Sequence, residues 1–221
     1  MHIETLFTYM TLTVIGLLPI MNPPAAAAVL LGLSKGRDKS YIVSQAKTTG
    51  VYLFIALCIT FFIGASVLEL FSISIPSLRL GGGIIIVAIG FNMLFPRTEN
   101  TSTPIGQDSI ALVPLTIPSL CGPGSMAVII SLAAQIATYE NHTSMTSVYG
   151  GVVAGLAVVA VIATITLTMA YPLLKALGQN GINAFTRIMG FLLICMGVQF
   201  FTLGIQEIVI ELNHVLINEA A

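Results

Sequence analysis

The chain contains little charge and no tryptophan. Only 8% of its 221 residues are Asp, Glu, Lys or Arg, whereas 56% are hydrophobic, and the mean hydropathy is +0.99. A soluble domain carries about 25% charged residues. The net charge of −1 provides no basic face that could neutralise phosphates. The composition therefore indicates a polytopic protein surrounded by a lipid bilayer, and it excludes a nucleic-acid-binding protein.

Signatures of catalysis and of metal or phosphate binding are also missing. The sequence contains no HExxH, GxSxG or GxxxxGK motif. Its three cysteines, Cys58, Cys121 and Cys195, lie in apolar runs without metal-site spacing, which favours packing roles. No Asp, Glu, Lys or His occurs at the centre of a predicted span. We therefore expect no enzymatic activity, no cofactor and no metal.

Hydrophobic runs between short polar segments predict an all-α membrane protein with six spans, since a spanning helix needs about 20 residues. The chain is predicted to form one membrane domain, 1–221. Within it, 1–100 and 105–211 are two three-span repeats, and 212–221 is a short C-terminal tail. The predicted spans are 6–33, 48–71, 78–96, 110–138, 148–173 and 186–209.

The basic residues predict the orientation, because cytoplasmic loops carry an excess of Lys and Arg. If both termini lie outside, Arg79 is the only basic residue near an outer loop. The basic residues in or beside the inner loops are then Lys35, Arg37, Lys39, Lys47, Arg97, Lys175 and Arg187. The most polar connections are 34–40, 96–109, 139–144 and 175–183.

Two apolar runs carry matching proline interruptions. Residues 5–34 and 109–139 are uncharged, and each run is longer than one straight span requires. The first run contains Pro19 and then Asn22, Pro23 and Pro24; the second contains Pro118 and then Gly122, Pro123 and Gly124. Backbone groups freed by a proline persist in lipid only when they are buried in protein or line a wet cavity. Paired interruptions in two halves point to the substrate site of a secondary transporter.

The residues after each interruption predict a new helix that starts at membrane depth. Pro23 and Pro123 suit the first helical position, with Asn22 and Gly122 as N-caps, and Ser125 adds a hydroxyl to the second helix. A helix N-terminus offers unpaired N–H groups and about half a positive charge. These termini suit the anionic group of a solute. In the alternative interpretation, the prolines only shape helix packing.

The third span of each half begins with a similar pattern. RLGGGIIIVAIGFNML starts at Arg79 and RIMGFLLICMGVQFFTL starts at Arg187, 108 residues later. Three spans per repeat place the second copy upside down relative to the first. Asn92 and Gln199 occupy matching positions, and an amide in lipid needs a partner, so we expect both to face the protein interior. Arg79 and Arg187 are expected to anchor span ends, cap the breaks or act in gating.

Three segments, LLPIMNPPAA, PLTIPSLCGPGSM and RIMGFLLICMGVQFFTLGIQ, resemble the MarC family of bacterial inner-membrane proteins, and the resemblance covers almost the whole chain. It implies six spans in a bacterial inner membrane, so that the outer termini are periplasmic. It also implies kinship with transporters built from three-span units, some of them transporters of neutral amino acids. The positions that match the family pattern and carry functional weight are Asn22, Pro23, Pro118, Gly122, Pro123, Gly124, Arg187, Gly190 and Gln199.

These observations predict a secondary transporter of a small polar solute, with neutral amino acids as the leading class. The alternative is a membrane scaffold or regulator without a solute, and either protein could form a homo-oligomer. The predicted substrate-binding residues are Asn22, Pro23, Pro24, Asn92, Gly122, Pro123, Gly124, Ser125 and Gln199. The predicted structural or gating residues are Pro19, Arg79, Pro118 and Arg187.

Overall fold

The computed structural model describes residues 2–34, 36–95, 109–138 and 145–219, which contain helices and no strand. Five helices are long and apolar enough to cross a membrane, and the bent pair η1 and α5 makes a sixth candidate. This confirms the all-α class and the approximate number of spans. The elements are α1 (His2–Met21), α2 (Pro23–Leu33), α3 (Lys39–Leu70), α4 (Ile75–Leu94), the π-helical η1 (Ala111–Leu120), α5 (Pro123–Thr138), α6 (Met145–Thr168) and α7 (Ala170–Glu219).

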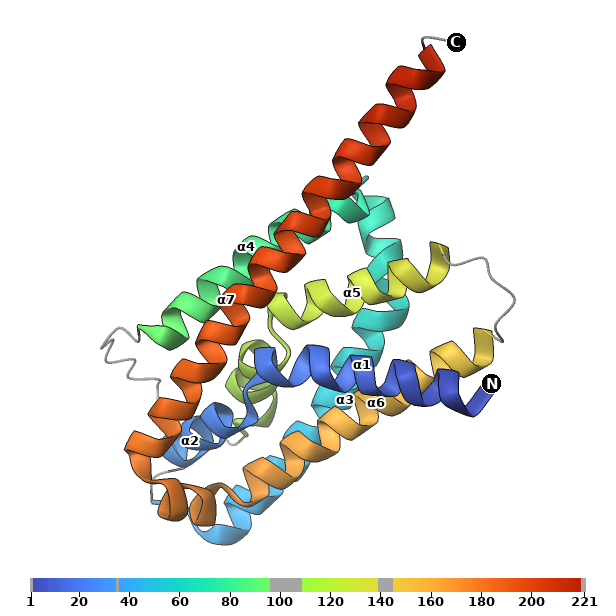
Figure 1. Ribbon diagram of the computed structural model, residues 1–221. Helices are drawn as coiled ribbons and strands as arrows, with labels where there is room; N and C mark the ends of the chain where they lie inside the picture. The colour runs from blue at the N-terminus through green and yellow to red at the C-terminus, as the bar shows by residue number, and fades with distance from the viewer. Residues whose placement is uncertain (1, 35, 96–108, 139–144, 220–221) are drawn as a thin grey trace.

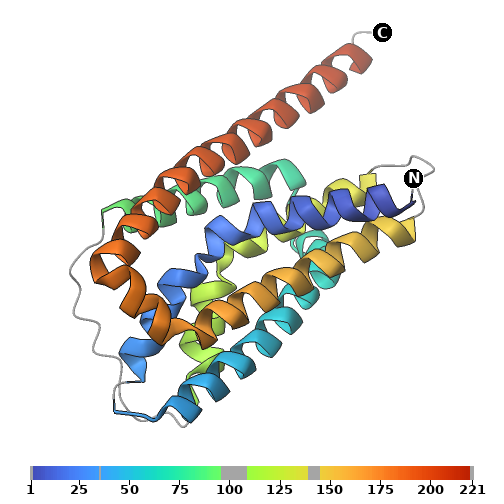
Figure 2. The same cartoon turned by 60° about the horizontal axis from the view of Figure 1, so that its bottom comes forward.

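The long helices run between two ends of the molecule. Both chain ends lie toward the same end, together with the α3–α4 junction, the end of α5 and the start of α6 (Figures 1 and 2). The end of α4 and the bend in α7 lie at the opposite end. The last turns of α7 project beyond the other helices in both views.

The main core lies between the interrupted segments and the two uninterrupted helices α3 and α6. Leu53 and Leu57 of α3 and Leu156 and Leu167 of α6 are fully buried. Residues on the outer faces are large and apolar, as expected for side chains in contact with lipid.

Helices α4 and α7 pack together, antiparallel, along a row of glycines. A Cβ atom added at Gly83 would lie 2.7 Å from the Gly197 carbonyl oxygen, and one added at Gly90 would lie 2.7 Å from the Gly190 carbonyl oxygen. The reciprocal distances are both 2.8 Å, and Gly204 continues the row by one heptad. Glycine therefore allows the two backbones to touch, as small residues do in membrane helix pairs.

Helix α3 begins nine residues before the predicted span 48–71, so Lys47 lies inside the helix and not at its start. The Asp38 side chain accepts a hydrogen bond from the Tyr41 N–H at 3.2 Å and so caps the helix N-terminus.

The predicted connection 175–183 is not an irregular loop. These residues are helical except for a kink at Gly178, whose φ of 63° and ψ of 172° suit glycine. Helix α7 also continues through much of the predicted tail to Glu219. The predicted connection 139–144, residues 96–108 of the connection 96–109, and Lys35 lie outside the described residues.

Candidate solute site

The first interruption is the single residue Asn22, between α1 and α2. Its backbone is left-handed, with φ 43° and ψ 63°, a conformation that Asn tolerates better than most residues. The Asn22 N–H donates to the Leu18 carbonyl at 3.0 Å. The Asn22 carbonyl accepts from the N–H groups of Ala25 and Ala26 at 3.0 and 3.2 Å. Asn22 therefore ends one helix and starts the next through its backbone.

The Asn22 side chain does not form the expected capping hydrogen bond. The residue is only 4% exposed, and neither Oδ1 nor Nδ2 has a hydrogen-bond partner. Leaving a buried polar group unpaired costs about 1–3 kcal/mol. Pro23, the first residue of α2, is buried beside it, Pro24 is half-buried, and Pro19 stays within the last turn of α1. The first break thus holds an unsatisfied amide at a helix N-terminus.

The second interruption lies between η1 and α5, whose axes are bent by 64°. Helix α5 begins at Pro123, which is exposed, and Gly122 before it is half-buried. Ser125 is fully buried, and its hydroxyl lies 2.9 Å from the Gly122 carbonyl oxygen and 3.3 Å from that of Leu120. This hydroxyl therefore hydrogen-bonds to backbone carbonyls at the break.

Prolines also distort η1 itself. Val113 and Ile117 leave helical geometry, and each precedes a proline. A residue before proline is disfavoured in the α region, because the proline ring crowds its backbone N–H and Cβ. Pro114 is half-buried and Pro118 is exposed.

The two interruptions lie next to each other. A Cβ atom added at Gly124 would lie 3.5 Å from Cγ2 of Ile20, which precedes Asn22 by two residues. Met21 and Cys121, at the ends of α1 and η1, are buried in the same apolar cluster. The fold thus brings together the two segments that the sequence singles out.

A cavity of about 120 Å³ lies between α1, α5, α6 and α7. Gly16 leaves space there, since a Cβ atom added to it would come no closer than 3.9 Å to Val128. Most of the wall is apolar, with Thr13 and Gln135 as its polar members. Leu17 lies five residues before Asn22 and Val128 lies five residues after Pro123, which is about 7.5 Å along a helix in each case. The cavity is therefore close to the breaks but separate from them.

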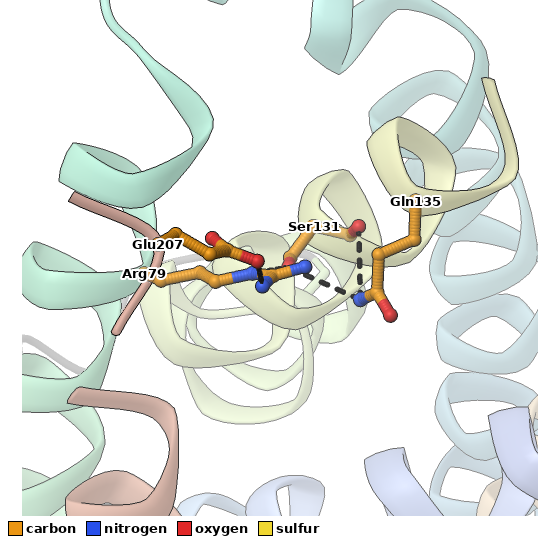
Figure 3. Close-up of polar contacts among 4 residues, drawn as sticks. All are labelled: Arg79, Ser131, Gln135 and Glu207. Carbon is orange, nitrogen blue, oxygen red and sulfur yellow. Dashed lines mark hydrogen bonds and ion pairs between the residues drawn. The ribbon is translucent and has the colours of Figure 1, made fainter. Parts of the chain in front are cut away.

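A buried polar cluster joins α4, α5 and α7 (Figure 3). Arg79 of α4 is 6% exposed. Its Nε donates to the Ser131 hydroxyl of α5 at 3.0 Å, and its Nη1 forms an ion pair with the Glu207 carboxylate of α7. The side-chain amide nitrogen of Gln135, Nε2, donates to the Ser131 carbonyl at 3.2 Å. The second Glu207 oxygen, Oε2, is buried and has no hydrogen-bond partner.

The position of Arg79 in this cluster does not fit the predicted role of capping a break. Ser131 lies eight residues beyond Pro123, so Arg79 contacts α5 two turns after the break and does not cap it. Arg187 is exposed on α7.

The expectation that Asn92 and Gln199 face the protein interior is wrong, because both side chains are exposed. The glycine row turns Gly90 and Gly197 inward, and a residue two positions further along a helix points away from them. These amides therefore lie apart from both breaks.

Several polar residues at the site were not singled out from the sequence. Gln45 of α3 is buried, and its Oε1 accepts hydrogen bonds from the Ile110 N–H at 3.0 Å and the Ser109 hydroxyl at 3.1 Å, which anchors the start of η1. The Thr49 hydroxyl, one turn later, lies 3.4 Å from the Ala111 carbonyl oxygen. In the sequence, Gln45 and Thr49 are two polar residues four positions apart, just before an apolar run, and this spacing could have indicated them. Glu207 had a similar signal, a carboxylate within the predicted span 186–209.

Apolar spanning helices, prolines at interior helix starts and a buried ion pair define a polytopic helical membrane protein. The chain belongs to the MarC family of integral membrane proteins, whose family model matches residues 7–209. It is 38% identical to the inner membrane protein MarC of Escherichia coli O157:H7, over 95% of this chain and 99% of that protein. It is 37% identical to the protein of the same name from Shigella flexneri, over 92% and 97%. No solved structure matches the chain.

Proposed function

We propose that the protein is a secondary transporter of a small polar solute, which binds where the two interruptions meet. Neutral amino acids are the leading class. The observation that carries the proposal is Asn22, whose buried amide has a donor and an acceptor without partners beside the N-terminus of α2. The amide can bind either end of a zwitterion. Pro23 and Pro24 have no N–H, and those of Ala25 and Ala26 donate to the Asn22 carbonyl, so the α2 terminus favours a carboxylate through its dipole alone.

The contacts between helices support two inverted repeats. In such repeats, α1 to α4 correspond in order to η1, α5, α6 and α7. The packing of α1 against α6 then corresponds to that of η1 against α3, and the packing of α2 against α7 corresponds to that of α5 against α4. The glycine row between α4 and α7 is also symmetric with respect to the two repeats. Gly83 and Gly190 are 107 residues apart, as are Gly90 and Gly197, so an axis that exchanges the repeats exchanges the two glycine contacts. We propose this architecture with both termini periplasmic.

The polar groups at the breaks favour transport over catalysis. They are an amide, a hydroxyl and backbone N–H and carbonyl groups, none of which is an effective general acid or base near neutral pH. The proposal therefore assigns these groups to solute binding only.

Thermal unfolding with a panel of amino acids and other small metabolites tests the proposal. A ligand at 100 times its Kd adds about 2.7 kcal/mol of stability, which raises the Tm. Uptake of each stabilising compound into proteoliposomes then separates transport from binding. If no compound shifts the Tm and none is taken up, the scaffold or regulator is the better interpretation.

Pro23→Ala and Pro123→Ala test whether the breaks form the site. Each change supplies a new backbone N–H, which can pair with a carbonyl of the preceding turn and so alters the helix terminus. At the first break Pro24 still prevents a continuous helix, so only Pro123→Ala can join the two helices on either side of its break. We expect the variants to fold but to bind solute more weakly, by about 1.5–3 kcal/mol for each charge-assisted hydrogen bond lost. Gly32→Ala is the control, because nothing lies within 4 Å of a Cβ atom there. Full transport by both proline variants would show that the breaks are not the site.

A further inference from the structure

The polar cluster around Arg79 connects the closely packed helix pair α4 and α7 with helix α5. Helices α4 and α7 touch backbone to backbone along the glycine row and so form one rigid pair. Helix α5 follows a 64° bend and packs against α4 of this pair. Arg79 belongs to the pair and hydrogen-bonds to Ser131 of α5, so its guanidinium joins the two parts.

The same cluster adjoins the cavity. Gln135 lines the cavity, and its amide donates to the Ser131 carbonyl of the cluster. Phe200 of α7 lines the cavity from the other side, seven residues before Glu207. Arg79 lies one turn into α4 and Gln135 lies in the last turn of α5, so the cluster is toward the end of the molecule at which α5 ends and α7 projects (Figure 1).

The ion pair is incompletely satisfied. Glu207 Oε2 is buried without a partner, although the Glu207 side chain is 35% exposed. Arg79 in contrast is almost fully enclosed. A buried ion pair stabilises a structure only when its remaining hydrogen-bonding groups are satisfied. This pair is thus placed to separate at its Glu207 side, which is the more exposed of the two.

We propose that the Arg79–Glu207 ion pair, with Ser131, is a gate that closes the cavity between α1, α5, α6 and α7 toward this end of the molecule. Separation of the pair releases the Arg79 guanidinium from its position, so that its hydrogen bond to Ser131 is lost, α5 is freed from α4 and the cavity opens to water. What passes the gate depends on the proposed transport function, whereas the closure itself is a property of the three helices.

Cysteine accessibility measures the closure without any solute. Gly16→Cys, in a chain whose Cys58, Cys121 and Cys195 are replaced by alanine, puts a thiol in the cavity wall, where a side chain has space. A membrane-impermeant methanethiosulfonate reagent is added to proteoliposomes. Ile73→Cys, exposed at the α3–α4 turn, reports orientation and reagent activity. We expect slow labelling of Cys at position 16 while the ion pair is intact.

Glu207→Gln and Arg79→Gln should each accelerate labelling of the cysteine at position 16 at least tenfold, when the reagent is added on the side of the membrane where Ile73→Cys is labelled. The double variant should react no faster than either single variant, because both changes remove the same closure. Ser131→Ala keeps the ion pair but removes its link to α5, so it should accelerate labelling to a similar extent. This variant tests the gate even if a charge variant does not fold. Glu211→Gln, one turn further along α7 and exposed, is the control.

Unchanged labelling in the folded variants, equal acceleration by Glu211→Gln, or multiplied rates in the double variant would each overturn the gate. Failure of solute uptake with the expected labelling pattern would overturn the transport function and leave the gate in place.

Discussion

Asn22 is the residue at which local strain and burial coincide. Its left-handed backbone and its unpaired amide both oppose folding. The interpretation of this residue from the sequence as an N-cap gave the right position for the start of α2 but the wrong side-chain interaction. The amide is therefore available for a solute.

Replacing Asn22 by glycine should separate stability from binding. Glycine adopts the left-handed conformation readily, and it removes the buried unpaired amide. We expect the free energy of unfolding of Asn22→Gly to stay unchanged or to rise by up to about 2 kcal/mol, with loss of the Tm shift caused by solute. Asn22→Ala, which keeps the strain, should be less stable than Asn22→Gly. A glycine variant that retains the full solute response would rule out direct contact with Asn22.

The residue types in the sequence predicted the positions of the helix starts well, but they did not predict the directions in which side chains point. The prolines located both helix starts, because a missing N–H acts locally. The orientation of Asn92 and Gln199 depends on which face of α4 and α7 the glycine row occupies, and several glycines in each span were candidates for that row. Partners distant in sequence, such as Arg79 and Glu207, depend on this packing too.

At the scale of elements, the α4–α7 pair is the most closely packed contact. Gly83→Ala should push the helices apart, because its Cβ would lie 2.7 Å from a backbone oxygen that no side-chain rotation can move. Overpacking of this kind costs about 1–3 kcal/mol. Thermal unfolding in detergent measures the loss.

Gly81→Ala is a matched control on the same helix, since nothing lies within 4 Å of its Cβ. Its stability should equal or exceed that of the unchanged protein, because alanine favours the helix. Equal losses at positions 81 and 83 would mean that helix propensity, and not contact with α7, determines the effect.

At the scale of the whole molecule, α3 should place its ends on opposite sides of the membrane. In a cysteine-free background, Ser40→Cys lies in the first turn of this helix and Ile73→Cys lies in the turn that follows its end, and both positions are exposed. We expect an impermeant maleimide to label position 73 in intact cells and position 40 only after permeabilisation. Labelling of both from one side would contradict the six-span arrangement.

Composition alone predicted the membrane class, because 8% charge cannot cover a soluble surface. Helix ends were harder to predict. The polar stretch around Gly178 and Gly181 suggests a loop, yet only Gly178 leaves helical geometry. A polar helix turn outside the bilayer and a polar loop have the same composition, so hydrophobicity cannot distinguish them.

The distance in sequence between Arg79 and Glu207 has a consequence for biosynthesis. The arginine is made 128 residues before the carboxylate that neutralises it. During translation, α4 enters the bilayer with a guanidinium whose counter-ion has not yet been made. An unpaired charge within a membrane is costly, so stable insertion of the first half depends on the arrival of the last helix. A ribosome-bound chain that stops before Glu207 should therefore remain associated with the insertion machinery, and a chain that includes α7 should be released into lipid.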